Sequence, residues 1–215
     1  MKINKFIDHT LLKAEATEEQ IRQACKEAIE YSFATVCVNP YYIPLVSSEL
    51  KLSDVEPCSV VGFPLGASES KVKAIETELA LANGAKEIDM VVNLGALKSG
   101  RMDIVSEEIK NIAAVTGDNA ILKVIIECCL LEDEEKTAVC RTVLNNGADY
   151  VKTSTGFNSG GAMVEDVRLM RQAVGSKMGI KAAGGIKDYH TAIKFIEAGA
   201  NRIGTSSGVA LVKEI

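Results

Sequence analysis

Gly147-Ala148-Asp149-Tyr150-Val151-Lys152 is one of three similar hexapeptides in this chain of 215 residues. The other two are Gly84-Ala85-Lys86-Glu87-Ile88-Asp89 and Gly199-Ala200-Asn201-Arg202-Ile203-Gly204. Each begins with a glycine, which suits the left-handed position just past a helix, and then enters a short strand-like run. The repetition indicates one strand-and-helix unit used several times, as a barrel of parallel strands requires.

Strand-like and helix-like runs alternate along the rest of the chain. Thr17-Glu18-Glu19-Gln20 is a capping-box pattern, and the apolar residues after it recur at the helical period up to Ile29. Other helices are expected at 42–48, 68–82, 103–115, 132–146 and 164–174, then after Asp188 and at the C-terminal end. In the helix that Ser68 opens, the residues expected to face inward are Val72, Ile75, Leu79 and Ala82.

Eight strands are predicted, at residues 6–9, 34–38, 58–62, 87–92, 121–127, 149–152, 178–181 and 201–204. Eight strands with helices between them, in a chain of this length, favour an α/β fold with one (β/α)8 TIM barrel. The alternative is an open, doubly wound sheet. Because no linker, low-complexity segment or charge block divides the chain, we expect residues 1–215 to form one catalytic domain.

The composition narrows the class of protein. Hydrophobic residues make up 47%, aromatic residues 5%, and tryptophan is absent, so the core must be aliphatic. The net charge is −5, with 24 Lys+Arg scattered among 29 Asp+Glu, which disfavours a nucleic-acid or anionic-membrane surface. No apolar run suits a transmembrane helix, and no signal-peptide pattern opens the chain. We therefore expect a cytoplasmic protein with neither nucleic acid nor membrane as a partner.

The six cysteines form no C-x-x-C pair, and there are only two histidines, His9 and His190. A zinc site usually needs several such ligands converging on one point. We therefore expect no metal and no cofactor, and we interpret the cysteines as reduced, buried apolar residues.

The repeat also predicts the position of the active site. The fifth residue after each glycine is Asp89, Lys152 or Gly204, and equivalent units would place all three at one level near the strands' C-terminal ends. Barrel enzymes carry their active sites on that face. A register slip of one residue would undo the inference.

Lys152 is the candidate nucleophile. A buried ammonium is costly unless it is paired or gives up its proton, so a lysine at a strand end suggests a use for its amine. Lys181 lies near the end of the next strand, and two neighbouring ammonium groups would disfavour each other's protonation. A free amine can attack a carbonyl and form an imine. The alternative is a pair of unrelated, solvated lysines.

Asp89 interrupts an apolar run, where a carboxylate is uncommon without a partner. It can relay protons near the imine, or it can form a structural ion pair with a barrel lysine, and both can be true. Lys123 and Asp8 also lie inside strand-like runs, and they either line the pocket or belong to a polar layer of the barrel.

Two glycine-rich loops follow the last two predicted strands: Gly184-Gly185-Ile186-Lys187-Asp188 and Gly204-Thr205-Ser206-Ser207-Gly208. Such loops let backbone N–H groups approach an anion, and barrels often bind phosphate there. Gly156, after Lys152, can add another donor. The alternative is that these glycines only make tight turns.

Together, several blocks resemble the 2-deoxyribose-5-phosphate aldolase family from about residue 5 to residue 210. They are Ile7-Asp8-His9-Thr10-Leu11-Leu12, Val36-Cys37-Val38-Asn39-Pro40, Glu87-Ile88-Asp89-Met90-Val91, Lys123-Val124-Ile125-Ile126-Glu127, Val151-Lys152-Thr153-Ser154-Thr155-Gly156-Phe157, Lys181-Ala182-Ala183-Gly184-Gly185-Ile186 and Gly204-Thr205-Ser206-Ser207.

The resemblance implies a class I lyase, free of metal, that cleaves 2-deoxy-D-ribose 5-phosphate to acetaldehyde and D-glyceraldehyde 3-phosphate through a lysine Schiff base. It implies that Lys152 forms the imine, that Lys181 keeps its amine reactive and that Asp89 donates and accepts protons. It implies phosphate contacts from Gly156, Gly184, Gly185, Gly204, Ser206 and Ser207, and a pocket lined by Cys37 and Lys123. The partners implied are a phosphosugar and an aldehyde, and we expect a homo-oligomer, although the sequence identifies no interface.

Two departures from the family pattern stand out. Some members use a C-terminal tyrosine in proton transfer, whereas the last tyrosine here is Tyr189, so we expect Asp89 and water to move that proton. Glu127-Cys128 stands where Glu-Thr is expected. The rival hypotheses are another Schiff-base sugar-phosphate aldolase or transaldolase, an acid–base isomerase of sugar phosphates, and a non-catalytic phosphosugar-binding protein.

Overall fold

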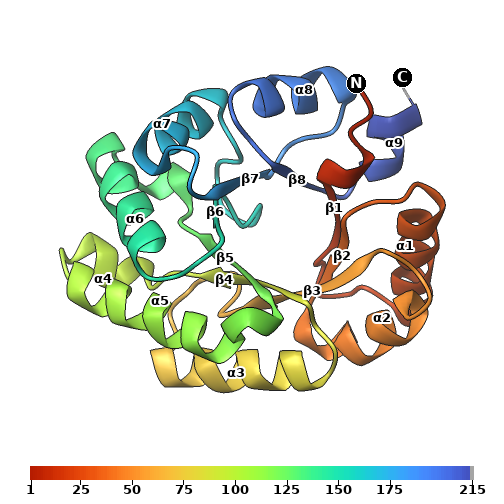
Figure 1. Ribbon diagram of the computed structural model, residues 1–215, viewed down its shortest axis with the longest axis horizontal. Helices are drawn as coiled ribbons and strands as arrows, with labels where there is room; N and C mark the ends of the chain where they lie inside the picture. Colours follow the sequence, from red (N-terminus) through yellow and green to blue (C-terminus); the bar gives the residue numbers. More distant parts are fainter. Residues whose placement is uncertain (214–215) are drawn as a thin grey trace.

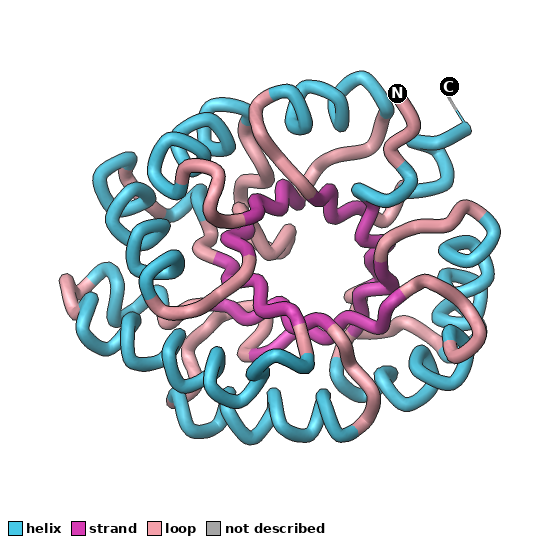
Figure 2. The backbone as a smooth tube through the Cα atoms, in the orientation of Figure 1, coloured by secondary structure: helices cyan, strands magenta, loops and turns pink. Residues whose placement is uncertain are grey.

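The fold is a closed barrel of eight parallel strands in sequential order, seen in a computed structural model that describes residues 1–213. Figure 2 shows the ring of strands with the helices around it. The predicted (β/α)8 TIM barrel is therefore confirmed. The strands are β1 (Ile7–Leu11), β2 (Thr35–Val38), β3 (Glu56–Val61), β4 (Glu87–Val91), β5 (Ile121–Ile125), β6 (Tyr150–Lys152), β7 (Gly179–Ala183) and β8 (Arg202–Thr205).

Helices connect the strands and cover the outside of the barrel (Figure 1). The α-helices are α1 (Glu18–Glu30), α2 (Ile43–Leu50), α3 (Ser70–Ala82), α4 (Leu94–Lys98), α5 (Met102–Thr116), α6 (Asp133–Asn145), α7 (Val164–Val174), α8 (Tyr189–Glu197) and α9 (Gly208–Lys213), with 3-10 turns η1 (Asn4–Phe6), η2 (Pro40–Tyr42), η3 (Gly117–Asn119) and η4 (Cys128–Leu130). The predicted capping box at Thr17 is present in full. The short helix α4 was not predicted. Within residues 1–213, no helix combines the length and apolar character needed to cross a membrane.

Side chains alternate along each strand, so that one set packs in the hydrophobic core under the helices and the other points into the barrel. Ile88, Val151, Ile180 and Ile203 point outward and pack under the helices, and none of them is exposed to solvent. Their neighbours along the strands point into the barrel, as alternation requires. Those inward neighbours carry most of the charged residues described below.

The register agrees with the level that the hexapeptide repeat predicts. Following the strand pairing across two strands leads from Asp89 to Tyr150, and from Lys152 to Arg202. Lys152 and Gly204 each lie two residues beyond those partners. Strands of a closed barrel tilt and stagger, so this offset keeps Asp89, Lys152 and Gly204 at one height along the barrel axis.

The facing of α3 was predicted wrongly. Val72, Ile75 and Leu79 are exposed by 51%, 48% and 59%, and Ala82 is exposed too. The buried positions are instead Lys73, Thr77 and Ala80. The helical period was right, but the helix is rotated so that its apolar stripe faces solvent.

A buried ion pair explains this rotation. The Nζ atom of Lys73 lies 2.6 Å from Oε1 of Glu108 on α5 and donates to the carbonyl oxygen of Val91 at 2.8 Å. The other oxygen of Glu108 accepts from the backbone N–H of Asn93. A buried ammonium needs such partners, and they exist only on the inner side of α3.

Candidate active site

An ionic cluster occupies the interior of the barrel. In the described part of the chain it comprises three carboxylates and four cationic side chains, joined by ion pairs and drawn from six of the eight strands. Its members are Asp8, Glu87, Asp89, Lys123, Lys152, Lys181 and Arg202. Because these charges are out of water, each depends on its partners.

Asp89 is the centre of the cluster. Its Oδ2 atom accepts hydrogen bonds from Lys152 at 2.6 Å and from Lys181 at 2.7 Å, and its Oδ1 atom accepts from Lys123 at 2.7 Å. Burial alone would raise the pKa of Asp89, but the three ammonium groups outweigh it and hold that pKa well below its usual range. Asp89 is therefore ionised, and it brings Lys152 and Lys181 together as the sequence predicted.

The three lysines differ in how many carboxylates they touch. Lys123 lies 2.6 Å from Glu87, 2.7 Å from Asp89 and 3.8 Å from Asp8. Lys181 contacts Asp8 at 2.6 Å as well as Asp89. Burial lowers the pKa of both groups, but the carboxylates outweigh it and raise each pKa above its usual value. Among the described residues, Lys152 forms an ion pair with Asp89 alone.

Arg202, the first residue of β8, lies at the end of the cluster that is nearer the N-terminal ends of the strands. Its guanidinium donates to Asp8 at 2.6 Å and to Glu87 at 2.8 Å. Burial would raise the pKa of Asp8, yet Lys181, Lys123 and Arg202 together lower it. Glu87 and Arg202 were not predicted as site residues. Their signal was present, since they lie two residues before Asp89 and Gly204 and so share the inward face.

A cavity of about 280 Å³ opens above the cluster, on the side of the C-terminal strand ends. Of the cluster's three described lysines, Lys152 alone lines this cavity, with 2% of its surface exposed. The predicted residues that also line it are Gly156, Gly184, Gly185, Gly204 and Ser206. The cavity wall further includes Thr10, Thr155, Phe157 and Lys187, which were not predicted.

The other predicted residues lie beside or below the cavity. Cys37, Lys123 and Asp8, which were expected to line the pocket, are completely buried and are absent from the cavity wall. Asp89 and Lys181 lie beneath it in the ionic cluster. Ser207 is half-buried, and its backbone N–H already donates to Thr205 Oγ1 at 2.9 Å.

Glycines allow the close contacts around the cavity. A Cβ atom at Gly204 would lie 3.0 Å from Cε of Lys181, so this glycine leaves room for the lysine to reach the carboxylates. Gly184 has a φ of +93°, and a Cβ there would lie 2.9 Å from the Cα of Gly161. The loops after β6 and β7 therefore touch through their backbones, which no larger residue would permit.

Glu127 holds the loop that follows the catalytic candidate Lys152. Its carboxylate, 1% exposed, accepts from the backbone N–H of Thr155 at 3.1 Å and from the Thr155 hydroxyl at 2.5 Å. Glu127 has a φ of +54°, in the left-handed region that non-glycine residues rarely adopt. A strained backbone persists only where the surrounding structure holds it in place, so the strain at Glu127 indicates that its contact to Thr155 is retained at an energetic cost. Sequence reasoning assigned Glu127 no role.

Two thiols lie against Asp89 inside the barrel. Cys58 Sγ is 3.3 Å from Oδ1 of Asp89, and Cys37 Sγ is 3.9 Å from Oδ2. The donor atoms of these three residues lie within 4.8 Å of one another, which is a possible metal-ligand spacing. The oxygens of Asp89 already bind three ammonium groups, however, and their charge opposes a bound cation.

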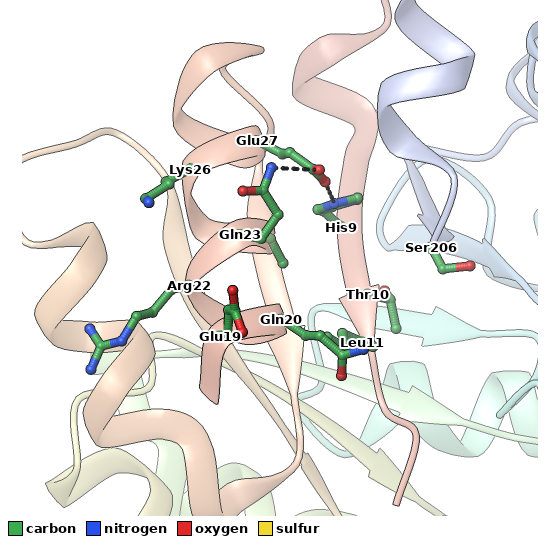
Figure 3. Close-up of a pocket in the computed structure, with 11 residues that line it drawn as sticks. His9, Thr10, Leu11, Glu19, Gln20, Arg22, Gln23, Lys26, Glu27 and Ser206 are labelled. Atoms are coloured by element: carbon green, nitrogen blue, oxygen red, sulfur yellow. Dashed lines mark hydrogen bonds and ion pairs between the residues drawn. The ribbon is translucent and has the colours of Figure 1, made fainter. Parts of the chain in front are cut away.

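A second hollow, of about 500 Å³, lies between β1 and α1 and shares Thr10, Leu11 and Ser206 with the first (Figure 3). Some of its charged groups are bound to partners: His9 Nε2 lies 2.8 Å from Oε2 of Glu27, and Arg22 pairs with Glu49. Figure 3 shows Arg22 and Lys26 extending away from His9 and Ser206. The chemistry is therefore concentrated in the smaller cavity over Lys152.

Comparison with known proteins identifies the family. Residues 2–214 match the sequence model of the DeoC/LacD family of aldolases. This chain belongs to that aldolase family. It is therefore a lyase, and its barrel carries a cluster of lysines where an aldolase can form an imine.

Relatives and solved structures agree with this assignment. The chain is 58% identical over 214 residues to a deoxyribose-phosphate aldolase of Clostridium tetani, covering 100% of this chain and 99% of that protein. A putative deoxyribose-phosphate aldolase of Coccidioides immitis matches with a TM-score of 0.96 and 42% identity over 99% of this chain and 85% of that one. A deoxyribose phosphate aldolase of Aeropyrum pernix, described as tetrameric, matches with a TM-score of 0.92 and 35% identity, covering 99% and 90%.

Proposed function

We propose that this aldolase cleaves 2-deoxy-D-ribose 5-phosphate reversibly to D-glyceraldehyde 3-phosphate and acetaldehyde, through a Schiff base on Lys152. The names of relatives that match along the whole chain support this substrate. The single observation that supports the nucleophile is the position of Lys152. It is the lysine of the cluster that lines the cavity, and it has the fewest carboxylate partners.

The charge balance of the cluster supports the same choice. With every group ionised, four cations face three carboxylates. An amine must be neutral to attack a carbonyl, and a neutral Lys152 leaves three cations facing three carboxylates. Lys181 and Lys123 keep their charge, because the carboxylates beside them raise their pKa. In this proposal Lys181 acts by holding Asp89 and by opposing a second positive charge on Lys152.

The reaction begins when the Lys152 Nζ attacks C1 of the open-chain sugar phosphate. Asp89, together with water, moves protons so that the carbinolamine oxygen leaves as water and an iminium forms. The C2–C3 bond then breaks, its electrons pass into the iminium, and the C3 hydroxyl loses its proton to become the aldehyde of glyceraldehyde 3-phosphate. Protonation of the remaining enamine and addition of water release acetaldehyde and restore the amine. The Asp89 carboxylate lies 2.6 Å from Nζ and stabilises the positive iminium.

The loops after β6, β7 and β8 bind the phosphate in this proposal. Its donors are Gly156, Gly184, Gly185, Gly204, Ser206 and the hydroxyl of Ser207, and the exposed Lys187 on the cavity wall adds positive charge. Binding the phosphate at this end positions C1 of the sugar at the amine. Lys123 and Asp8 position Asp89 and Lys181, and Cys37 packs against Asp89.

Three broader proposals accompany this function. The cytoplasm is the proposed location, which agrees with the six free cysteines. Residues 1–215 form one catalytic domain, because the family match covers residues 2–214. The protein forms a homo-oligomer, in keeping with the tetrameric relative from Aeropyrum pernix.

A coupled assay tests the substrate. Incubation with 2-deoxyribose 5-phosphate should release acetaldehyde, measured by its reduction with alcohol dehydrogenase and NADH. Lys152→Leu should abolish this release, whereas Lys177→Leu, at an exposed lysine, should not change it. Cleavage of other sugar phosphates but not this one would favour another Schiff-base aldolase or transaldolase. Isomerisation without aldehyde release, or binding without turnover, would contradict the proposed function.

A further inference from the structure

Cys37 and Cys58 lie side by side inside the barrel, on the neighbouring strands β2 and β3. They are register partners in the parallel pairing of these strands, which Figure 1 shows next to each other. Neither side chain is exposed to solvent. The two Sγ atoms and one carboxylate oxygen of Asp89 lie within 4.8 Å of one another. Each thiol is therefore a neighbour of the other as well as of the carboxylate.

The backbone spacing of this pair suits a disulfide. Neighbouring strands lie about 4.8 Å apart, and the Cα atoms that a disulfide joins are usually about 4.4–6.8 Å apart. Both side chains point into the barrel, since both contact Asp89. Rotation about the two Cα–Cβ bonds can then bring the sulfur atoms to bonding distance while the strands stay in place.

The two thiols differ in the way that stepwise oxidation requires. Hydrogen bonding with Cys58 lowers the pKa of Cys37. The charges of Lys181 and Lys152 lower that pKa further, and these effects outweigh the burial of Cys37. Burial raises the pKa of Cys58 well above its usual value. Cys37 is therefore the thiol that reacts with an oxidant, because the thiolate is the reactive form, and Cys58 is the thiol that reacts second.

The side chain of Leu12 connects the pair with the active-site cavity. Leu12 lines that cavity and belongs to the same apolar cluster as both cysteines. Hydrogen peroxide is nearly as small as water, so a movement of this one side chain is enough to admit it from the cavity to the sulfur of Cys37.

We propose that hydrogen peroxide joins Cys37 and Cys58 in a disulfide that reversibly inactivates the enzyme. The sulfur of Cys37 attacks one peroxide oxygen, the O–O bond breaks, and the other oxygen leaves as water. The sulfur of Cys58 then attacks the resulting sulfenic acid, whose hydroxyl leaves with the Cys58 proton as a second water. Two thiols lose two electrons and one peroxide gains them. A dithiol reverses the change by thiol–disulfide exchange.

The disulfide changes the surroundings of Asp89. In the reduced protein Cys58 donates to its Oδ1 atom at 3.3 Å and Cys37 donates to its Oδ2 atom at 3.9 Å. Oxidation removes both donors and draws the two sulfur atoms to about 2.05 Å from each other. Asp89 then loses two of the contacts that fix its position beside Lys152. This effect on activity rests on the function proposed for Lys152, whereas formation of the disulfide does not.

Peptide mapping tests the disulfide itself. The full chain is treated with hydrogen peroxide, denatured in N-ethylmaleimide to block free thiols, and digested without reduction. The expected product is a peptide pair joined through Cys37 and Cys58, lighter than the two separate peptides by two hydrogen atoms and absent after treatment with dithiothreitol. Treated protein in which both thiols are still blocked, or in which Cys37 is oxidised without a link to Cys58, would overturn the inference.

Release of acetaldehyde tests the effect on activity. Oxidation should lower the rate by about tenfold or more, since a displacement of about 1 Å at reacting groups can cost a hundredfold, and dithiothreitol should restore it. With excess peroxide, Cys58→Ala should lose this recovery, because a sulfenic acid without a second thiol oxidises further to a form that thiols cannot reduce. Cys129→Ala, at an exposed cysteine, is the matched control and should behave as the wild type does.

A disulfide that leaves the rate unchanged, or full recovery of Cys58→Ala, would overturn the proposed inactivation. Untreated protein that releases no acetaldehyde would instead contradict the proposed function, and the mapping result would still decide whether the disulfide forms. The two failures are therefore distinguishable.

Discussion

Asp89 accepts hydrogen bonds from three lysines through two oxygen atoms, and one of those oxygens is shared by Lys152 and Lys181. This sharing links the reactivity of one lysine to the charge of the other. If Lys181 were neutral, the carboxylate would stabilise the ammonium form of Lys152 without competition. A higher pH would then be needed to produce the free amine.

Lys181→Leu should therefore move the pH–activity profile upward. We expect the midpoint on the acidic side to rise by about one unit or more, because one pH unit corresponds to about 1.4 kcal/mol and a buried charge contact is worth at least that. Steady-state cleavage rates between pH 5 and pH 10 provide the measurement, with Lys177→Leu as the control. An unchanged midpoint would show that Lys181 does not control the amine.

Glu127→Gln should weaken substrate binding more than it slows chemistry. The amide keeps one oxygen acceptor but turns an NH2 group toward a donor of Thr155, so a buried hydrogen bond to a charged group is lost. Such bonds are worth about 1.5–3 kcal/mol, and we expect KM to rise by about tenfold or more. Glu134→Gln, at an exposed position on α6, is the control. A large fall in kcat with KM unchanged would contradict this positioning role.

At this scale, the sequence predicted part of the ionic cluster. Lys152 and Lys181 were singled out near strand ends and Asp89 inside an apolar run, because a charged side chain is costly to bury there unless it has a partner or a function. Arg202 was missed because an arginine in a short strand can equally well be exposed. Glu127 was missed because its role depends on a left-handed backbone and on a contact to Thr155, 28 residues away. Periodicity cannot predict either feature.

Among the elements, α3 shows how a helix can satisfy its period and still be turned the wrong way. Apolar spacing alone placed Val72, Ile75 and Leu79 inward, but the ion pair between Lys73 and Glu108 required the opposite facing. The partner of Lys73 lies 35 residues away on another helix, as the numbering shows. The sequence of the helix alone therefore cannot reveal this partner.

Lys73→Met should destabilise the fold by about 3–5 kcal/mol, because it leaves the buried Glu108 carboxylate without its counter-ion. The double variant Lys73→Met with Glu108→Leu should lose much less than the sum of the two single losses. Urea unfolding, followed by circular dichroism, gives the free energies. Lys110→Met, at an exposed lysine of α5, is the control, and strictly additive single losses would contradict the pairing.

The whole molecule combines an aliphatic shell with a charged interior. Strand number, order and closure followed from the repeat and from the alternation of strands and helices, because both are local signals. The sequence did not reveal how many charged side chains lie inside the barrel, because each ion pair joins strands that are distant in sequence. The register of the barrel, rather than any single motif, brings these charges together.

The charged interior predicts how stability depends on pH. The pKa values of Asp8 and Asp89 are lowered by folding, so their contribution is present above the unfolded value of 3.8 and is lost as the pH falls through the lower, folded values. Lys123 and Lys181 have raised pKa values, so their contribution is present below the unfolded value of 10.5 and is lost as the pH rises above it.

The contribution of these groups to the free energy of unfolding should therefore be nearly constant between about pH 4 and about pH 10 and should fall on both sides. Urea unfolding at pH values within this range and on both sides of it provides the measurement. In Asp8→Asn, which removes one depressed carboxyl, the acid-side slope should be smaller than in the wild type. An acid-side slope that is unchanged would mean that these carboxylates do not control acid stability.

The central claim is that the amine of Lys152 forms the imine. Reduction with borohydride in the presence of acetaldehyde, followed by peptide mapping with mass spectrometry, tests it most directly. We predict one ethyl group on Lys152, none on Lys123 or Lys181, and neither label nor cleavage in Lys152→Leu. Labelling of Lys181 in place of Lys152, or turnover by Lys152→Leu, would contradict the account.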